Sequence, residues 1–299
     1  MSDVDLPQHL PVMVDEATRL LQPERGGTYV DCTVGLGGHT RALLEHGAER
    51  VIGFDRDPQA LALASRQLES YGARVHLVHA DYRTLDTVLD SLGVALVAGA
   101  LADLGVSSMQ FDAEGRGFSF RRDEPLDMRM DQSQGQTVAE RLATVDEADL
   151  ADVIYQFGEE RRSRRVARGI VMARERAPIE TTGQLAAIVR RSLSGQSWQR
   201  IDPATRTFQA LRIWVNGELE RLDEFVRRAA VRLQTGGRLV VISFHSLEDR
   251  IVKHTLRALD RTDGVVRVLT GRPLAPTEAE IALNPRARSA KLRAAERLA

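Results

Sequence analysis

The sequence has one cysteine, few lysines and no long apolar run. Because Cys32 is alone among the 299 residues, no intrachain disulfide can form, and we expect a buried thiol in a reducing cytoplasm. The longest apolar stretch, Leu92 to Ala102, is too short to cross a bilayer. Residues Met1 to Pro11 are polar and acidic, unlike a signal peptide. These absences predict a cytoplasmic protein that does not contact a membrane.

A large net charge of one sign is also missing. The formal net charge is −1, which argues against a general binder of polyanions. The charge is uneven, however, because the segment from Glu159 to Arg200 holds ten arginines against four acids. This local positive charge indicates either a phosphate-binding surface or a solvated helix face. Arginine outnumbers lysine in the whole chain, so its use in this segment is not by itself distinctive. The seven histidines are scattered, and we expect no metal site.

The most informative stretch is DCTVGLGGHT, residues 31–40. It reads as the end of a strand, a glycine-rich turn and the start of a helix near Thr40. Glycines at 35, 37 and 38 allow a tight turn and a close approach of the backbone to a ligand. Asp55 ends the next strand, twenty positions after Gly35, where an acid accepts the hydroxyls of a ribose. The pattern predicts a site for a nucleoside-bearing cofactor.

Two residues of this stretch distinguish between cofactors. A dinucleotide-binding turn would have a third glycine at position 40, where this chain has Thr40. Asp31, at the strand end, would repel a pyrophosphate but suits a cation such as the sulfonium of S-adenosylmethionine. We therefore favour this methyl donor over a nicotinamide cofactor. A βαβ turn without a ligand is the remaining alternative.

The order of the elements predicts a doubly wound α/β sheet. We expect strands at Val30, 51–55, 74–79, 95–103 and 238–244, with short additional ones at 264–269 and 289–292. Helices are expected at 40–46, 58–71 and 82–92, and again at 138–157, 159–176 and 182–194. A helix from 202 to 233 would run through Asn216-Gly217 and end at Gly236-Gly237. The expected α/β domain is 1–108 with 203–299, interrupted by a helical insertion, 109–202.

Polar residues follow the expected strands, at the sheet edge where ligands bind. Asp81 would hydrogen-bond an adenine amino group, and the Tyr82 ring would pack on the base. Asp103 would orient an amine nucleophile or receive its proton. His245, with Ser243 and Ser246 beside it, is a candidate base. His39 is expected to make hydrogen bonds at the start of its helix.

Several longer strings occur together in one order. They are HLPVMVDE (9–16), GLGGH (35–39), FDRDP (54–58), DLGVSS (103–108), GRGFSF (115–120), PLDMRMD (125–131), YQFGEER (155–161), PATRTFQALRI (203–213), ISFHSLEDRIV (242–252) and NPRARS (284–289). Together they resemble the bacterial 16S rRNA cytosine-N4 methyltransferase family, RsmH or MraW. The resemblance runs from about His9 to the C-terminus.

The resemblance implies S-adenosylmethionine as donor and a class I methyltransferase fold with a helical insertion that recognises RNA. It implies N4 methylation of a cytidine in the decoding centre, the P-site region, of small-subunit rRNA. The family's cofactor positions fall on Gly37, Gly38, His39, Asp55, Tyr82, Asp103 and Gln110; the local pattern adds Asp31, Gly35 and Asp81. Tyr82 stands where some members have phenylalanine. Asp103-Leu-Gly-Val stands where other amino-methylating families have Asp/Asn-Pro-Pro-Tyr.

We expect Asp103 and His245 to carry the chemistry. The expected substrate contacts are Ser107, Ser108, Arg206, Ser243, Phe244 and His245, with the Phe244 ring stacked on the cytosine. The expected partner is 16S rRNA, naked or in the small subunit, and the sequence leaves a homodimer open. The alternatives are an assembly factor that binds rRNA without catalysis, a nicotinamide oxidoreductase, and a methyltransferase acting on protein or DNA.

Overall fold

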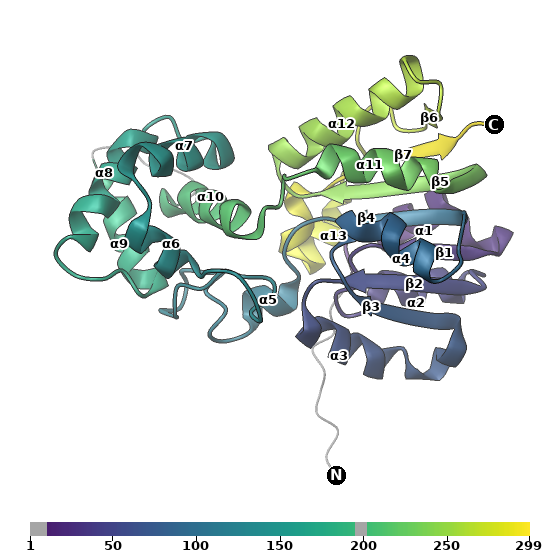
Figure 1. Ribbon diagram of the computed structural model, residues 1–299, viewed down its shortest axis with the longest axis horizontal. Coiled ribbons are helices and arrows are strands. Elements are labelled where there is room, and N and C mark those ends of the chain that lie inside the picture. Colours follow the sequence, from purple (N-terminus) through teal and green to yellow (C-terminus); the bar gives the residue numbers. More distant parts are fainter. Residues whose placement is uncertain (1–10, 195–201) are drawn as a thin grey trace, which may run out of the picture. The chain divides into compact units, whose positions relative to one another are not determined.

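The structure is a computed structural model that describes residues 11–194 and 202–299. It consists of two compact units (Figure 1). One combines Met1–Gly105 with Arg221–Ala299, and the other is Val106–Glu220. The second unit is thus wider than the insertion expected at 109–202, because the helix after Asp202 groups with it. Arg200 and His9 lie outside the described residues.

The first unit is built on a sheet of seven strands among its described residues, in the order β3-β2-β1-β4-β5-β7-β6. The strands are β1 Thr28–Asp31, β2 Arg50–Asp55, β3 Val75–His79, β4 Val97–Asp103, β5 Leu233–Ser243, β6 Val266–Val268 and β7 Lys291–Arg297. The first five are parallel, whereas β7 runs antiparallel to both β5 and β6. This arrangement confirms the predicted doubly wound α/β sheet.

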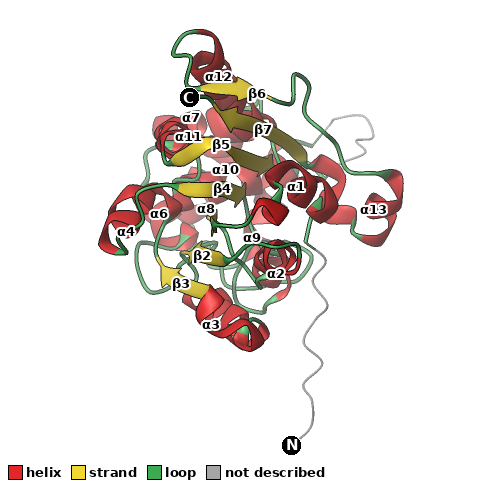
Figure 2. Cartoon of the chain, turned by 90° about the vertical axis from the view of Figure 1, so that its right-hand side faces the viewer, coloured by secondary structure: helices red, strands yellow, loops and turns green. Residues whose placement is uncertain are grey.

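Helices cover both faces of this sheet (Figure 2). On one side lie α1 (Val14–Leu21) and α2 (Gly38–Glu45), and on the other lie α4 (Leu85–Ser91) and α11 (Leu222–Val231). The remaining helices of this unit are α3 Pro58–Gln67, α12 Ser246–Arg261 and α13 Glu278–Leu283, with 3₁₀ turns at Pro23–Arg25, Glu69–Arg74, Tyr82–Thr84 and Pro285–Ser289. Residues 97–102 of β4 are all buried, as expected for a strand covered on both faces.

The strand ends bring the polar residues of the sequence motifs to one edge. In the register of the parallel strands, Asp31 pairs with Gly53, and Asp103 pairs with Ile242. The carboxyl ends of these parallel strands therefore lie at the same edge of the sheet. The ends of β1 to β5 and the loops that follow them carry the predicted ligand-binding residues of this unit.

The second unit is helical over the described residues that form regular structure. Its helices are α5 Ser108–Asp112, α6 Val138–Thr144, α7 Glu147–Gly158, α8 Ser163–Arg174, α9 Thr182–Ser192 and α10 Ala204–Asn216. Their apolar faces form a core of their own, which includes Leu142, Ile154, Val166, Leu185 and Leu211. The single helix expected at 138–157 is in fact two, α6 and α7, with Val145 extended between them.

The continuous helix expected from 202 to 233 is wrong. Helix α10 ends at Asn216, and Gly217 adopts φ 60° as its C-cap, so α11 begins only at Leu222. Asn216 is buried and binds a loop of the same unit: its Nδ2 donates to the Met128 carbonyl, and its Oδ1 accepts from the Met130 N–H. Gly236-Gly237 does not end a helix either, because both residues lie within β5.

Among the described residues, no helix is long and apolar enough to cross a membrane. The single cysteine is buried, with 1% of its surface exposed, directly after β1. The burial of Cys32 agrees with the sequence analysis.

Candidate active site

The glycine-rich turn joins β1 to α2 and leaves room beside its backbone. Gly35 has φ 54°, and a Cβ built on it would meet no atom within 4 Å. Gly37 has φ 85°, and a Cβ there would lie 2.9 Å from Cδ1 of Leu68. Position 37 therefore needs glycine for the packing of the turn, whereas position 35 needs it for the backbone conformation and faces open space. A ligand can approach the chain at Gly35.

Asp55 at the end of β2 is tied to this turn. Its Oδ2 accepts a hydrogen bond of 2.8 Å from the Gly35 N–H, and its Oδ1 accepts one of 2.9 Å from the Asp57 N–H. Burial raises the pKa of Asp55 to about 6, although these two hydrogen bonds oppose the shift. A carboxylate oxygen has two acceptor positions, so each oxygen keeps one for a ribose hydroxyl. The residues present thus fit the ribose of a nucleoside cofactor.

Asp31 lies entirely inside the protein beneath the turn. It is 0% exposed, and its oxygens accept from the Thr40 hydroxyl at 2.7 Å and from the Thr33 N–H at 3.2 Å. Burial raises the pKa of Asp31, and the neighbouring His39 acts in the opposite direction. The carboxylate therefore braces the start of α2 and contributes negative charge from below, without being exposed to a ligand.

Asp103 ends β4 and faces His39. The Asp103 N–H donates to the Thr33 hydroxyl oxygen at 2.7 Å, which fixes the end of the strand to the turn. Its Oδ2 lies 3.6 Å from Nε2 of His39, and its Oδ1 is buried with no hydrogen-bond partner among the described residues. Burial lowers the pKa of His39, but the Asp103 carboxylate, together with Asp31 and Glu280, raises it overall. An unsatisfied buried carboxylate oxygen points to a ligand that donates a hydrogen bond.

Asp81 and Tyr82 follow β3, where an adenine ring was expected. Asp81 accepts from Nε and Nη2 of Arg83 at 2.9 and 2.7 Å. Burial alone would raise the pKa of Asp81, but the hydrogen bonds from Arg83 hold it below its ordinary value. The ring of Tyr82 packs 4.5 Å from that of Phe225 on α11, tilted by 55°. An adenine amino group would therefore share Asp81 with Arg83.

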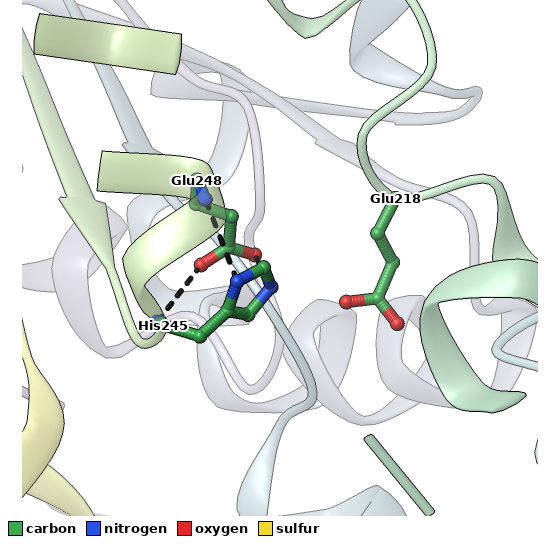
Figure 3. A group of neighbouring side chains, drawn as sticks. All are labelled: Glu218, His245 and Glu248. Atoms are coloured by element: carbon green, nitrogen blue, oxygen red, sulfur yellow. Dashed lines mark hydrogen bonds and ion pairs between the residues drawn. The ribbon is translucent and has the colours of Figure 1, made fainter. Parts of the chain in front are cut away.

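His245 serves as the N-cap of α12, as Figure 3 shows together with Glu248. Its Nδ1 accepts from the Glu248 N–H at 3.4 Å, and its Nε2 lies 3.1 Å from Glu248 Oε1. Glu248 also accepts from the Phe244 N–H at 2.9 Å and is 1% exposed. Because Nδ1 of His245 accepts from the Glu248 backbone, this conformation of His245 caps the helix start, and its role as a base stays a prediction.

The other predicted substrate residues divide between the two units. Ser243 is 2% exposed, and its hydroxyl donates to the Lys291 carbonyl at 3.3 Å, so it links β5 to β7. In the second unit, Ser107 and Gln110 form the capping box of α5, and Ser108 is the first residue of that helix. Arg206 on α10 pairs with Glu160 at 3.7 Å. The ligand contacts of these residues stay predictions.

Sequence reasoning missed three residues that shape the site. Thr33 accepts from the backbone of Asp103, Arg83 occupies Asp81, and Glu248 holds the start of α12. Glu248 could have been found, because a capping residue followed by glutamate three positions later marks a helix start. Thr33 and Arg83 carry no comparable signal, since their contacts depend on how the strands meet and which rotamer is chosen.

Comparisons with known proteins identify the family. The family model described as the MraW methylase family matches residues 7–298. The chain belongs to this family. Ribosomal RNA small subunit methyltransferase H of Geotalea uraniireducens is 47% identical, covering 97% of this chain and 98% of that protein. The proteins of the same name from Nitrobacter winogradskyi and Neisseria meningitidis serogroup B are 52% and 47% identical, covering 97% and 100% of this chain and 91% and 95% of theirs.

Membership in the MraW methylase family settles several expectations. It confirms the resemblance drawn from the sequence motifs, and the sheet agrees with the predicted class I methyltransferase fold. It also confirms S-adenosylmethionine as the cofactor in preference to a nicotinamide dinucleotide. The open space at Gly35 and the free acceptor positions of Asp55 fit this cofactor.

Proposed function

We propose that this protein methylates N4 of a cytidine in the decoding centre of 16S rRNA. The methyl donor is S-adenosylmethionine, and the small-subunit rRNA follows from relatives named Ribosomal RNA small subunit methyltransferase H. The choice of an exocyclic amine rests chiefly on Asp103, whose buried Oδ1 has no hydrogen-bond partner among the described residues. An amine is a donor, and this oxygen is an acceptor at the end of a central strand.

The cofactor would be held by residues of the first unit. Asp55 receives the ribose hydroxyls, the backbone near Gly35 makes room for the nucleoside, and Tyr82 offers an aromatic face to the adenine. When bound, S-adenosylmethionine supplies a methyl group on a positively charged sulfur. The buried carboxylate of Asp31 and the partly buried carboxylate of Asp103 favour that positive charge.

The chemistry requires positioning more than activation of a strong base. Cytosine N4 is a poor nucleophile, because its lone pair is delocalised into the ring. Asp103 Oδ1 would accept an N–H of the amine and so turn the lone pair toward the methyl group. The base must also leave its stack, which costs a few kcal/mol and needs a pocket. Phe244, directly after β5, would stack on it.

The second unit would bind the RNA through α8. Arg164, Arg165 and Arg168 of α8 are exposed, as are Arg161 and Arg162 just before it, and none has an ion-pair partner among the described residues. Arg190 of the same unit differs, since it pairs with Asp202 at 2.7 Å. Unpaired guanidinium groups along one helix are suited to phosphates, because they require no existing ion pair to be broken.

Transfer of labelled methyl groups tests the proposal. Small subunits and naked 16S rRNA from a strain lacking this gene are incubated with the protein and S-adenosylmethionine, and the digested RNA is analysed by nucleoside. Label in N4-methylcytidine supports the proposal, and comparison of the two substrates identifies the partner. Label in another nucleoside contradicts the target. Absence of label, with cofactor binding verified by calorimetry, favours the non-catalytic assembly factor.

A further inference from the structure

We propose that His39 is a positioning residue, which holds Oδ2 of Asp103 through its Nε2 and so leaves Oδ1 as the only oxygen available to the substrate amine. This assignment rests on the proposed function, because it concerns how Asp103 meets the nucleophile. It gives His39 a role beyond contact with the cofactor or the start of a helix.

The geometry of the two side chains carries the proposal. His39 is the second residue of α2 and is 6% exposed. Its Nε2 faces Asp103 Oδ2 at 3.6 Å and has no hydrogen bond among the described residues. A charge-assisted hydrogen bond is about 2.7–2.9 Å long. A closure of less than about 1 Å would therefore satisfy both buried atoms. A ligand that fills the site and excludes water would favour this closure.

The charges around His39 favour a donor at Nε2. Asp103 and Asp31 both act on the ring, and Glu280 of α13 adds a weaker contribution of the same sign. The N-terminus of α2 opposes a cation by about 0.3–1 kcal/mol. The carboxylates outweigh it, since burial of two carboxylates without a nearby cation would be costly. With His39 protonated, the side chains of Asp31, Asp103 and His39 together carry one net negative charge, which a sulfonium would balance.

The proposed step conserves atoms and charge. The N4 lone pair forms the new N–C bond, while the electron pair of the broken C–S bond stays on sulfur. The methylated amine then gives one proton to Oδ1 of Asp103, which becomes neutral. His39 keeps its own proton and, once the closure has formed it, the hydrogen bond to Oδ2 throughout. The positive charge lost by sulfur thus reappears as a proton on the carboxyl group, which later passes to water.

Two substitutions separate a positioning role from a structural one. His39→Gln keeps an N–H donor without a charge, and His39→Ala removes the donor. His46→Ala is the control, because His46 is exposed at the other end of the same helix. We expect His39→Ala to lower kcat on small subunits by about 100-fold, the cost of a misplaced reacting group. The Kd for S-adenosylmethionine should change far less, and His39→Gln should recover most of kcat.

A second measurement does not depend on the substrate. The titration of the His39 ring is followed by NMR in the full chain without cofactor, for the wild type and for Asp103→Asn. We expect the midpoint to fall in Asp103→Asn and to stay unchanged in His46→Ala. An unchanged midpoint in Asp103→Asn overturns the proposal, as does an equal loss of kcat in the Gln and Ala variants. If the wild type transfers no methyl group to rRNA, the proposed function fails, but the coupling of the two residues is still decided by NMR.

Discussion

The N–H of Gly35 donates a 2.8 Å hydrogen bond to Oδ2 of Asp55. This bond joins the turn after β1 to the end of β2, so the two elements proposed to bind the nucleoside are already connected in the absence of a ligand. A site that is already ordered loses less conformational entropy on binding. Substitution of Asp55 should therefore change two quantities that can be measured separately: the affinity for the cofactor and the pH dependence of the free energy of unfolding.

Asp55→Asn should weaken cofactor binding while the fold persists. The amide cannot accept on both sides, so at least one of the hydrogen bonds to the ribose or the turn is lost. Hydrogen bonds to charged groups contribute about 1.5–3 kcal/mol, so the Kd for S-adenosylmethionine should rise roughly 10- to 150-fold by calorimetry. Asp15→Asn, an exposed acid on α1, is the control. Equal affinity in both variants would remove Asp55 from the site.

The raised pKa of Asp55 predicts a stability change with a definite sign. Because the folded protein holds this proton up to about pH 6, against an ordinary value of 3.8, the contribution of Asp55 to stability is lost as the pH rises through this interval. The loss amounts to about 3 kcal/mol. Relative to the wild type, Asp55→Asn should therefore gain about this much between pH 4 and pH 7 in urea unfolding. A difference that does not vary with pH would contradict the shift.

Replacing each of three glycines with alanine should distinguish the effect of packing on stability from the effect of ligand access on cofactor binding. Gly72 and Gly35 have φ 53° and 54° and no atom near a built Cβ, so each variant should lose only the roughly 1 kcal/mol cost of the left-handed backbone. Gly37→Ala should lose more, because its Cβ would collide with Leu68. Only Gly35→Ala should weaken cofactor binding without further loss of stability. Thermal unfolding and calorimetry on the same samples test this order.

Glu248→Ala should destabilise the start of α12. The variant leaves the partly buried N–H of Phe244 without its acceptor and removes the carboxylate beside the His245 ring, at a cost of about 1–3 kcal/mol. Glu248→Gln keeps a carbonyl acceptor and should lose less. Chemical denaturation measures the difference. If Glu248→Ala unfolds like the wild type, Glu248 does not brace His245.

The arginines of α8 should govern the salt dependence of RNA binding. Replacing Arg164, Arg165 and Arg168 with alanine should reduce the slope of log K against log salt by up to about 2–3 for three phosphate contacts. Arg227→Ala is the control, since Arg227 already pairs with Asp263 at 2.9 Å. Filter binding to 16S rRNA between 50 and 200 mM salt, about the range in which such slopes are resolved, is the measurement. An unchanged slope in the triple variant would argue against α8.

Much of the sheet and of its ligand edge could be predicted from the sequence. Buried parallel strands are continuous apolar runs, and the acids Asp55 and Asp103 follow two of them directly, so their placement follows from the strand ends alone. The start of β5 could not be predicted. Its register against β4 shifts between Val97 and Gly99, and a Cβ at Gly237 would lie 2.8 Å from the Ala98 carbonyl. A glycine pair that marks such a close approach looks, in sequence, like a helix end.

The side-chain pairings of the site were the least predictable part. Asp81 was expected to meet an adenine, but Arg83, two residues later, folds back onto it. His39 and Asp103 are 64 residues apart in the sequence, and their approach depends on the pairing of β1 with β4. The end of α10 at Asn216 depends likewise on a tertiary contact, the amide bonded to the loop at Met128 and Met130. Local pattern carries no information on such contacts.

Strand β7, residues 291–297, lies between β5 and β6, although both precede it in the chain. During synthesis, β6 therefore has no neighbour in the sheet until β7 has left the ribosome, and β5 keeps one side open for the same interval. The nascent first unit therefore has an unpaired strand edge until these seven residues leave the ribosome. Such an edge can pair with strands of other chains.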